Sequence, residues 1–124
     1  MQPFLNLSNA EYEIMQYLWA QESPATLQDV IAYCNGENQR SWKQQTIYTF
    51  LSRLEQKGVV TAVKKGQKRY YSAAMTLDEL RSVSAQHFLD ANFKGSLKTF
   101  LTAFTGGQSM KEEDKAVLRE FLKD

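Results

Sequence analysis

Hydrophobic residues recur three or four positions apart in six stretches of this chain, which is the spacing of one face of an α-helix. We expect helices to begin near residues 8, 25, 41, 76, 96 and 109. The first runs to about Gln21, ahead of a Ser-Pro break, and the second ends at Asn35-Gly36. The fifth ends at Gly106-Gly107. The pattern therefore predicts a mainly helical chain.

Four of these helices are expected to start at a capping box, in which Glu or Gln stands three residues after Ser or Thr. The Ser or Thr oxygen accepts a hydrogen bond from an early helix N–H group, and the second side chain bonds back to the cap. The four boxes are Ser8–Glu11, Ser41–Gln44, Thr76–Glu79 and Ser109–Glu112. In the third helix, Ile47, Leu51 and Leu54 are expected to face a core, and Gly58 to end the helix after Lys57.

The segment after this third helix has the pattern of a β-hairpin. Val59–Val63 is short and rich in β-branched residues, and Arg69–Ser72 is expected to form the second strand. The connection Lys64–Lys68 contains Gly66, which adopts a positive φ easily. Three helices followed by a hairpin predict a winged helix-turn-helix domain in residues 1–75. Residues 76–124 are then a region of three helices.

Composition and length exclude several classes of protein. The chain has 124 residues, of which 43% are hydrophobic and 23% charged, as in an ordinary globular domain. No apolar run approaches the ~18 residues of a membrane span, and no signal peptide is recognisable, so we expect a cytoplasmic protein without membrane insertion. The single Cys34 is expected in the core, and with the single His87 it cannot build a four-ligand zinc site. We expect no cofactor and no metal.

The net charge of +1 conceals an uneven distribution along the chain. Residues 1–39 contain five acids and no base, and residues 76–124 contain seven bases and eight acids. Residues 40–75 contain eight bases and one acid, a net charge of +7. This basic block covers the third helix and the hairpin. A basic block of this kind is typical of a protein that binds a polyanion, and its alternative is a solvated charged face.

The basic block lies on the two elements with which a winged helix contacts DNA, so we interpret it as a binding surface for double-stranded DNA. Gln and Thr near the start of the third helix suit base edges, whereas Lys and Arg in the hairpin suit phosphates. Trp42 is expected to pack against the second helix or to lie against the DNA backbone, with packing slightly favoured. The residues expected to bind DNA are Lys43, Gln44, Gln45, Thr46, Tyr48, Thr49, Arg53, Lys64, Lys65, Lys68 and Arg69.

The last three helices carry more large apolar residues than three short helices can bury within one subunit. Such a surface is typical of an interface, and a homodimer would match a palindromic operator. The alternative is that these residues pack back onto the first domain. The residues expected to dimerise are Phe88, Leu97, Phe100, Leu101, Phe104, Leu118, Phe121 and Leu122.

Two sequence motifs carry a family resemblance. Residues 7–11 have the pattern Leu-x-x-Ala-Glu, with Leu18-Trp19 following. Residues 46–58 have the pattern Thr-Ile-x-Thr-x-x-x-Arg-Leu-x-x-Lys-Gly. With the hairpin and the Phe-rich C-terminal helices, these motifs resemble the penicillinase-repressor family, also called the BlaI/MecI/CopY family. The resemblance implies a dimeric winged-helix repressor of bacterial operons, with recognition residues at Thr46, Thr49 and Arg53.

The resemblance also implies a means of release, in which a membrane sensor metallopeptidase triggers cleavage within the fifth helix. The family has an Asn-Phe bond there, and this chain has Ala103-Phe104, so only the Phe is kept. The C-terminal region lacks the Cys-x-Cys pair of the copper-responsive branch, which excludes metal sensing by that route. Gln45 and Gln67 stand where the family often has basic residues, so the operator sequence is expected to differ.

Three other functions are alternatives to DNA binding. An enzyme is disfavoured, because the chain has no nucleophile motif and no Gly-rich phosphate loop. Acid pairs such as Asp78-Glu79 stand in first helical turns, where the helix dipole favours them. A ligand-sensing winged-helix regulator would need a pocket between the two domains. A winged helix used only for protein interaction would show no salt-dependent binding to duplex DNA.

Overall fold

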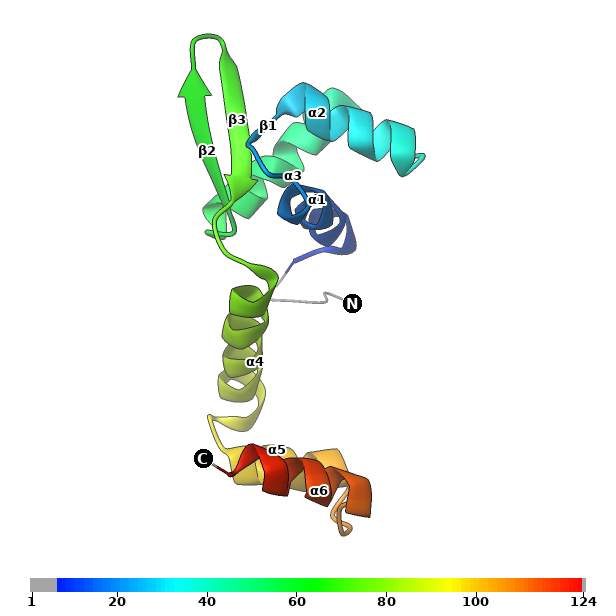
Figure 1. Ribbon diagram of the computed structural model, residues 1–124, viewed down its shortest axis with the longest axis vertical. Helices are drawn as coiled ribbons and strands as arrows, with labels where there is room; N and C mark the ends of the chain where they lie inside the picture. The colour runs from blue at the N-terminus through cyan, green and yellow to red at the C-terminus, as the bar shows by residue number, and fades with distance from the viewer. Residues whose placement is uncertain (1–6, 124) are drawn as a thin grey trace. The chain divides into compact units, whose positions relative to one another are not determined.

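Three helices and a three-stranded antiparallel sheet form the N-terminal part of the chain (Figure 1). The computed structural model describes residues 7–123. It divides the chain into two units, one ending at Ala85 and the other beginning at Gln86. The division falls inside helix α4 (Leu77–Phe93), which contributes its first half to one unit and its second half to the other.

The helices of the N-terminal unit are α1 (Asn9–Trp19), α2 (Leu27–Ala32) and α3 (Gln44–Gln56). A single π-helical turn, Tyr33–Glu37, extends α2. The expected first helix is therefore two residues too long, and the expected second helix is too short, since the chain continues its helical path through Asn35 and Gly36. Two of the predicted capping boxes that lie here, at Ser8 and Thr76, are confirmed with both reciprocal hydrogen bonds.

The sheet has the order β1-β3-β2. Strands β2 (Val60–Lys65) and β3 (Lys68–Ala73) form the predicted hairpin, whose strands are longer and whose loop is shorter than expected. The loop is only two residues, and its first residue is Gly66 at φ 63°, a conformation that glycine adopts without strain. Strand β1 (Ala25–Thr26) was expected to be the start of a helix.

Pairing with the hairpin explains why β1 is a strand. Ala25 lies opposite Tyr71 and Thr26 opposite Tyr70 in antiparallel register. Thr26 is also the N-cap of α2, because its hydroxyl oxygen accepts a hydrogen bond from the N–H group of Asp29 at 3.1 Å. The helix thus begins one residue after the strand ends. The short strand ties the N-terminal helices to the hairpin.

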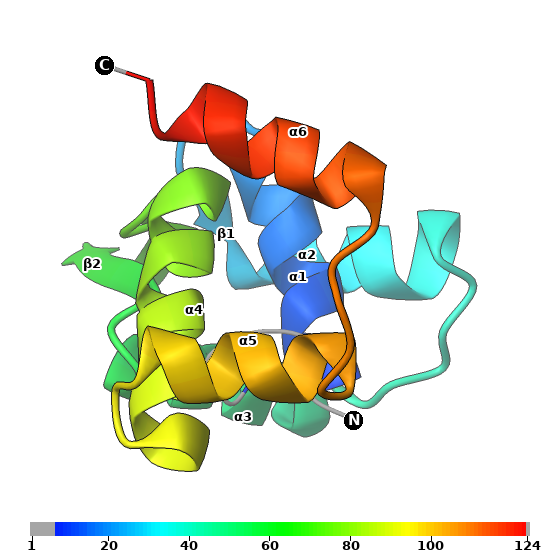
Figure 2. The ribbon, with the colours of Figure 1, turned by 90° about the horizontal axis from the view of Figure 1, so that it is seen from below.

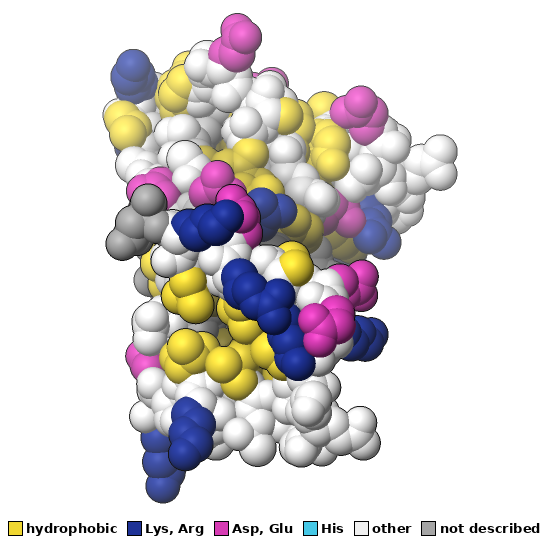
Figure 3. Space-filling view, turned by 60° about the horizontal axis from the view of Figure 1, so that its bottom comes forward, with side chains coloured by type: hydrophobic (Ala, Val, Ile, Leu, Met, Phe, Trp, Pro, Cys, Tyr) yellow, Lys and Arg dark blue, Asp and Glu magenta, His cyan; other side chains and the backbone are white. Residues whose placement is uncertain are grey.

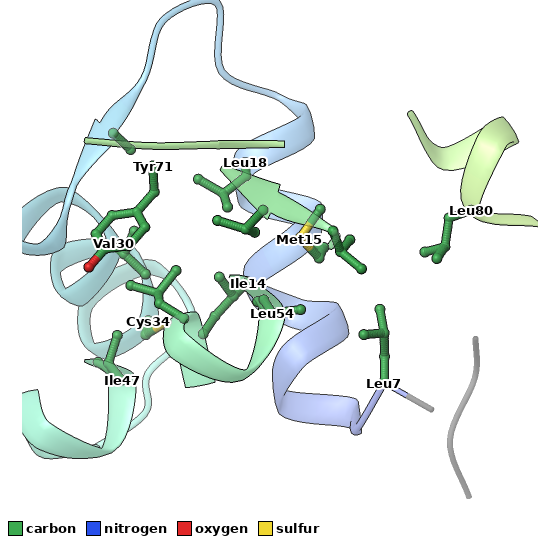
Figure 4. Packing of buried hydrophobic residues seen from close by; sticks show 14 residues of the cluster. Leu7, Ile14, Met15, Leu18, Val30, Cys34, Ile47, Leu54, Tyr71 and Leu80 are labelled. Atoms are coloured by element: carbon green, nitrogen blue, oxygen red, sulfur yellow. The ribbon is translucent and has the colours of Figure 1, made fainter. Parts of the chain in front are cut away.

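The hydrophobic core of the N-terminal unit lies between α1, α2, α3 and the sheet (Figure 4). Ile14, Val30 and Tyr71 extend into it from three different elements (Figure 4). The three residues expected to face inward from α3 are fully buried, as predicted. Cys34 is also fully buried, and burial raises the pKa of its thiol to about 11. The residues that form this core are Leu7, Ile14, Met15, Leu18, Ala25, Val30, Cys34, Ile47, Leu51, Leu54, Val59, Val60, Tyr71 and Leu80.

One buried acid joins the beginning of α1 to the end of α3. The Glu11 carboxylate, only 2% exposed, accepts a hydrogen bond from the Lys57 ammonium group at 2.7 Å. Lys57 is followed by Gly58 at φ 79°, whose N–H group donates to the Glu55 carbonyl. The next N–H group, that of Val59, donates to Leu54, which completes a Schellman motif. Gly58 therefore ends the helix as predicted.

The start of α3 differs from the prediction. Its N-cap is Lys43, without a side-chain cap, so the box expected at Ser41 is wrong. The cause lies in Asn35, whose side chain accepts from the Trp42 N–H group at 3.0 Å and donates to the Trp42 carbonyl at 2.8 Å. These bonds hold Trp42 outside the helix. Its ring packs edge-on against Phe50 of α3, with 5.4 Å between the ring centroids, whereas the sequence predicted packing against the second helix.

The C-terminal unit contains the second half of α4 with α5 (Leu97–Thr105) and α6 (Glu112–Phe121), joined by residues 106–111 (Figure 2). Helix α5 begins after Ser96 and ends at Gly106, which has φ 66°, and both positions are as expected. The side chain of Ser96 is also the N-cap. The capping box expected at Ser109 is wrong, because the N-cap of α6 is Lys111 and has no side-chain cap. Three acids in the first turn of α6 interact favourably with the helix dipole instead.

Candidate nucleic-acid interface

Helix α3 has one face in the core and a polar face outside. Because Ile47, Leu51 and Leu54 are fully buried, the intervening positions must point away from the core. On α3, the half-buried residues among those expected to bind DNA are Thr46 and Thr49. Those exposed on or just before the helix are Lys43, Gln44, Gln45, Tyr48 and Arg53. The outer surface of α3 thus carries amide, hydroxyl and basic groups with no acid in its first turn.

The hydroxyl group of Thr49 is already engaged within the helix. It donates to the backbone carbonyl of Gln45 at 2.9 Å. A Thr hydroxyl carries one proton, so this bond leaves Thr49 without a hydroxyl proton for a base edge. What Thr49 can still offer a partner is its methyl group and the lone pairs of its oxygen.

The tip of the hairpin concentrates positive charge. Lys64 lies directly opposite Arg69, and Lys65 directly opposite Lys68. The three lysines are exposed. Like charges directly opposite in a β-ladder are destabilising. Two such pairs side by side therefore favour a role in binding a polyanion, which would remove the repulsion.

Arg69 differs from these lysines, because it has partners within the domain. Its guanidinium group pairs with the Glu55 carboxylate of α3 at 3.2 Å and lies over the Tyr71 ring at 5.9 Å. A hydrogen bond with Tyr71, together with the attraction of Glu55, raises the pKa of Arg69. Arg69 therefore links the hairpin to α3, whereas the sequence predicted it only as a phosphate contact.

A second ion pair orders the connection that precedes α3. Arg40 bonds to the Glu13 carboxylate of α1 at 2.7 Å, and its guanidinium group lies 5.1 Å from the centre of the Trp42 ring. The hydrogen bond from Arg40 lowers the pKa of Glu13. Together with the Asn35 bonds to Trp42, this pair fixes the path by which the chain enters α3.

A hollow of about 340 Å³ lies between the start of α2, the first turns of α3 and the hairpin. We call it the α3–hairpin hollow. Its lining residues are Thr26, Leu27, Gln28, Tyr48, Gln67, Lys68, Arg69 and Tyr71. Sequence reasoning missed Thr26 and Gln28 as site residues, because no local pattern shows that residues 26–28 approach residues 67–71. The only signal in the sequence was that Ala25-Thr26 could pair with the hairpin as a short strand.

Large apolar side chains of the C-terminal unit are exposed. Figure 3 shows hydrophobic side chains open to solvent on the face that it presents. Phe104 is 63% exposed and Phe121 is 81% exposed. Phe88, Leu97 and Leu122 are likewise exposed. The remaining residues expected to dimerise, Phe100, Leu101 and Leu118, are half-buried.

Four aromatic rings pack together in this unit and account for part of its stability. Phe100 contacts Phe93 at 5.5 Å and Phe88 at 6.4 Å, both edge-on, and stacks on Phe104 at 5.9 Å. Phe88 and Phe93 lie 5.8 Å apart. Ala103, next to Phe104 on α5, is exposed.

Residues 7–123 contain no cluster of three or more His, Cys, Asp or Glu side chains placed to hold a metal ion. Among the same residues, no helix combines the length and the apolar character needed to cross a membrane.

The three helices, the three-stranded sheet and the hairpin with its basic tip define a winged helix-turn-helix domain followed by a helical region. The sequence matches the model of the penicillinase repressor family over residues 7–124, and the chain belongs to that family. The family resemblance seen in the sequence is thereby confirmed. The chain thus belongs to a family of repressors and not of enzymes.

Individual relatives are distant in sequence but match over nearly their whole length. The chain is 26% identical to the penicillinase repressor of Bacillus licheniformis over 124 residues, covering 100% of this chain and 94% of the relative. It is 22% identical to the penicillinase repressor of Staphylococcus aureus, covering 97% and 93%. It is 23% identical to the methicillin resistance regulatory protein MecI of Mammaliicoccus sciuri, covering 94% and 92%.

Two solved structures resemble the N-terminal part of the chain. One is the DNA-binding domain of the repressor BlaI, with 28% identity and a TM-score of 0.53. The other is the monomeric form of Bacillus licheniformis BlaI in complex with the blaP half-operator, with 28% identity and a TM-score of 0.50. Each match covers 64% of this chain and 93% of the solved chain.

Proposed function

We propose that this protein is a transcriptional repressor that binds a palindromic DNA operator as a homodimer. The observation that carries the proposal is the hairpin tip, where Lys64 faces Arg69 and Lys65 faces Lys68. The tip lies in the same domain as the polar outer face of α3. Membership of the penicillinase repressor family supports the proposal, as does the fold shared with BlaI.

We assign the two basic elements different tasks. Helix α3 enters the major groove, and Gln44, Gln45, Thr46 and Thr49 meet base edges there. The hairpin lysines and Arg53 contact phosphates, which supplies affinity and register without reading sequence. The residues assigned to DNA lie within residues 1–75, the proposed DNA-binding domain.

Residues 76–124 form the proposed dimerisation region. Its support is the set of exposed apolar side chains, with Phe121 and Leu122 among the most exposed. Such surfaces on small proteins are typical of interfaces. A two-fold symmetric dimer presents two α3 helices to two operator half-sites. The protein would act in the cytoplasm, where a bacterial operator lies.

Release by proteolysis is a further part of the proposal. The expected cleavage point, Ala103-Phe104, lies near the end of α5, and both residues are exposed. Cutting there would separate α6 from the rest of the dimerisation region. The proposed partner is a membrane sensor metallopeptidase. Incubation with such a sensor should give a fragment ending at Ala103, and mass spectrometry would identify it.

DNA binding can be tested by fluorescence anisotropy with the protein's own upstream promoter DNA, with a random duplex as competitor. We expect selective binding that weakens ~10³-fold or more between 50 and 200 mM salt if about six phosphates are contacted. Salt-independent binding, or binding without preference for the promoter, would contradict the proposal. A winged helix used only for protein interaction would show no duplex binding at all.

A further inference from the structure

The α3–hairpin hollow has the chemical character of an anion site. Two of its eight lining residues, Lys68 and Arg69, carry positive charge, and none is acidic. Five others, Thr26, Gln28, Tyr48, Gln67 and Tyr71, bring hydroxyl or amide groups. Side chains of these types donate hydrogen bonds to phosphate oxygens.

The walls of the hollow are held in place by contacts around it. Arg69 is fixed on one side by its ion pair with the Glu55 carboxylate, which offsets the charge of that acid. Residues 26–28 are fixed by the pairing of β1 with β3 and by the reciprocal bonds between Thr26 and Asp29. A site whose walls are already ordered loses little conformational entropy when it is filled.

The location of the hollow indicates which anion it takes. It lies between α3, the element proposed for the major groove, and the hairpin, which contacts the DNA beyond it. A sugar–phosphate backbone separates the major groove from the adjoining minor groove. The backbone must therefore cross the space between these two elements, and this space is the hollow.

We propose that the α3–hairpin hollow receives one phosphate of the DNA backbone, and that Gln28 is a DNA-contacting residue. The proposal rests on the DNA-binding function proposed above and adds a contact from α2 to it. Gln28 is exposed and lines the hollow from α2, whereas Lys68 lines it from the hairpin, so two different elements would contact the phosphate. The contact supplies affinity and register and reads no base.

The test is to change the charge at Gln28 and compare promoter binding with that of matched controls. Gln28→Glu places a negative charge against the phosphate, and Gln28→Lys places a positive one there. Gln16→Glu and Gln16→Lys are the controls, because Gln16 is exposed on α1 and does not line the hollow. Glutamate in the first turn of a helix is favourable, so Gln28→Glu should fold, and thermal unfolding checks this.

We expect Gln28→Glu to weaken binding about tenfold or more relative to Gln16→Glu, the scale of a like-charge contact near a protein surface. Gln28→Lys should bind more tightly at low salt and steepen the slope of log K against log salt by ~0.9, as for one more neutralised phosphate. Both effects should be equal on promoter and random duplexes, because a phosphate contact carries no sequence information.

The outcomes separate the two proposals. If wild type binds promoter DNA selectively but the Gln28 variants match the Gln16 variants, the phosphate contact is wrong and the repressor function stands. If wild type does not bind DNA, both fail. A third arm adds inorganic phosphate without DNA at constant ionic strength. Stabilisation of wild type by phosphate, lost in Gln28→Glu, with unchanged DNA binding in that variant, would overturn the assignment to DNA in favour of a free phosphate ligand.

Discussion

At the scale of single residues, Glu11 has two structural roles. Its carboxylate accepts from the Ser8 N–H group at 2.7 Å, which completes the capping box of α1. The same oxygen accepts from Lys57, 46 residues further along the chain. Burial opposes ionisation of Glu11, but the bonds from Lys57 and Ser8 outweigh it and lower its pKa. The capping role was predictable from the local sequence, whereas the partner 46 residues away was not.

We expect Glu11→Gln to reduce the free energy of unfolding by about 1.5–3 kcal/mol at pH 7, the range for a hydrogen bond to a charged group. Because the folded-state pKa is lowered, the charged pair stabilises the protein above the ordinary pKa of 4.5 and loses its effect as pH falls below it. The difference between variant and wild type should therefore shrink toward pH 3. Urea unfolding at both pH values measures it, with the surface change Glu22→Gln as control. An equal difference at pH 7 and pH 3 would refute the charge-based account.

Thr49 offers a second prediction at this scale, because its hydroxyl proton is used by the Gln45 carbonyl. If Thr49 meets a thymine methyl group, its own methyl group matters and its hydroxyl group does not. Thr49→Val should keep the preference for promoter over random DNA. Thr49→Ser should lose about 1 kcal/mol of it, the scale of one buried methyl group. Competition binding with both duplexes checks this, and the reverse order of the two variants would show that the hydroxyl group reads the base.

At the scale of elements, the hairpin is destabilised by like charges that lie opposite each other at its tip. Within each of the two like-charged pairs at its tip, the two side chains repel each other across the ladder, and a bound polyanion would offset that repulsion. The Glu55–Arg69 pair and the short strand β1 hold the hairpin against the rest of the domain. The hairpin is therefore anchored at its base and carries unbalanced charge at its tip.

Replacing Lys64 and Lys65 together by Gln should leave the free protein as stable as wild type or slightly more so. DNA affinity should fall, and the slope of log K against log salt should decrease by ~2, close to 0.9 for each phosphate contact removed. Thermal unfolding and anisotropy at several salt concentrations provide the two readouts. An unchanged salt slope would remove these lysines from the interface.

The same scale shows what local sequence predicts well and what it does not. The boxes at Ser8 and Thr76, the glycine end of α3 and the hairpin were predicted because each depends on residues a few positions apart. The box at Ser41 failed because Asn35 holds Trp42 outside the helix. Strand β1 was missed because only its pairing with β3 makes two residues a strand. The hydrophobic periodicity of α3 predicted that its basic residues face outward. It could not predict the α3–hairpin hollow, because three separate segments of the chain line the hollow.

At the scale of the whole molecule, the C-terminal unit exposes several large apolar side chains. Its aromatic cluster around Phe100 is packed, yet Val117, Phe121 and Leu122 on α6 remain exposed. The aromatic cluster stabilises the unit internally. The exposed residues of α6 are those proposed to contact a second copy of the chain. The sequence placed Phe100, Phe121 and Leu122 in one group, and the half-buried position of Phe100 separates it from the other two.

This separation makes Phe121→Asp a cleaner test of the dimer than a change at Phe100, which would also disturb the cluster. We expect the variant to be monomeric in light scattering and to bind the full operator more weakly. Binding to a single half-site should be unchanged. Ala20→Asp, an exposed position of the N-terminal unit, is the control. A Phe121→Asp protein that stays dimeric would place the interface elsewhere.

The buried thiol of Cys34 can report when the folded domain opens, because it reacts only when the core is exposed. The chain has one cysteine, and Cys34 lies in the interior with a pKa of about 11. Only the thiolate attacks thiol reagents, so the folded domain should resist a disulfide-exchange reagent at pH 8. Modification then requires an opening that exposes the core. The rate at which Cys34 is labelled would measure the rate of that opening. If promoter DNA binds only the folded domain, labelling should be slower with DNA present, and the decrease would report the affinity of the complex.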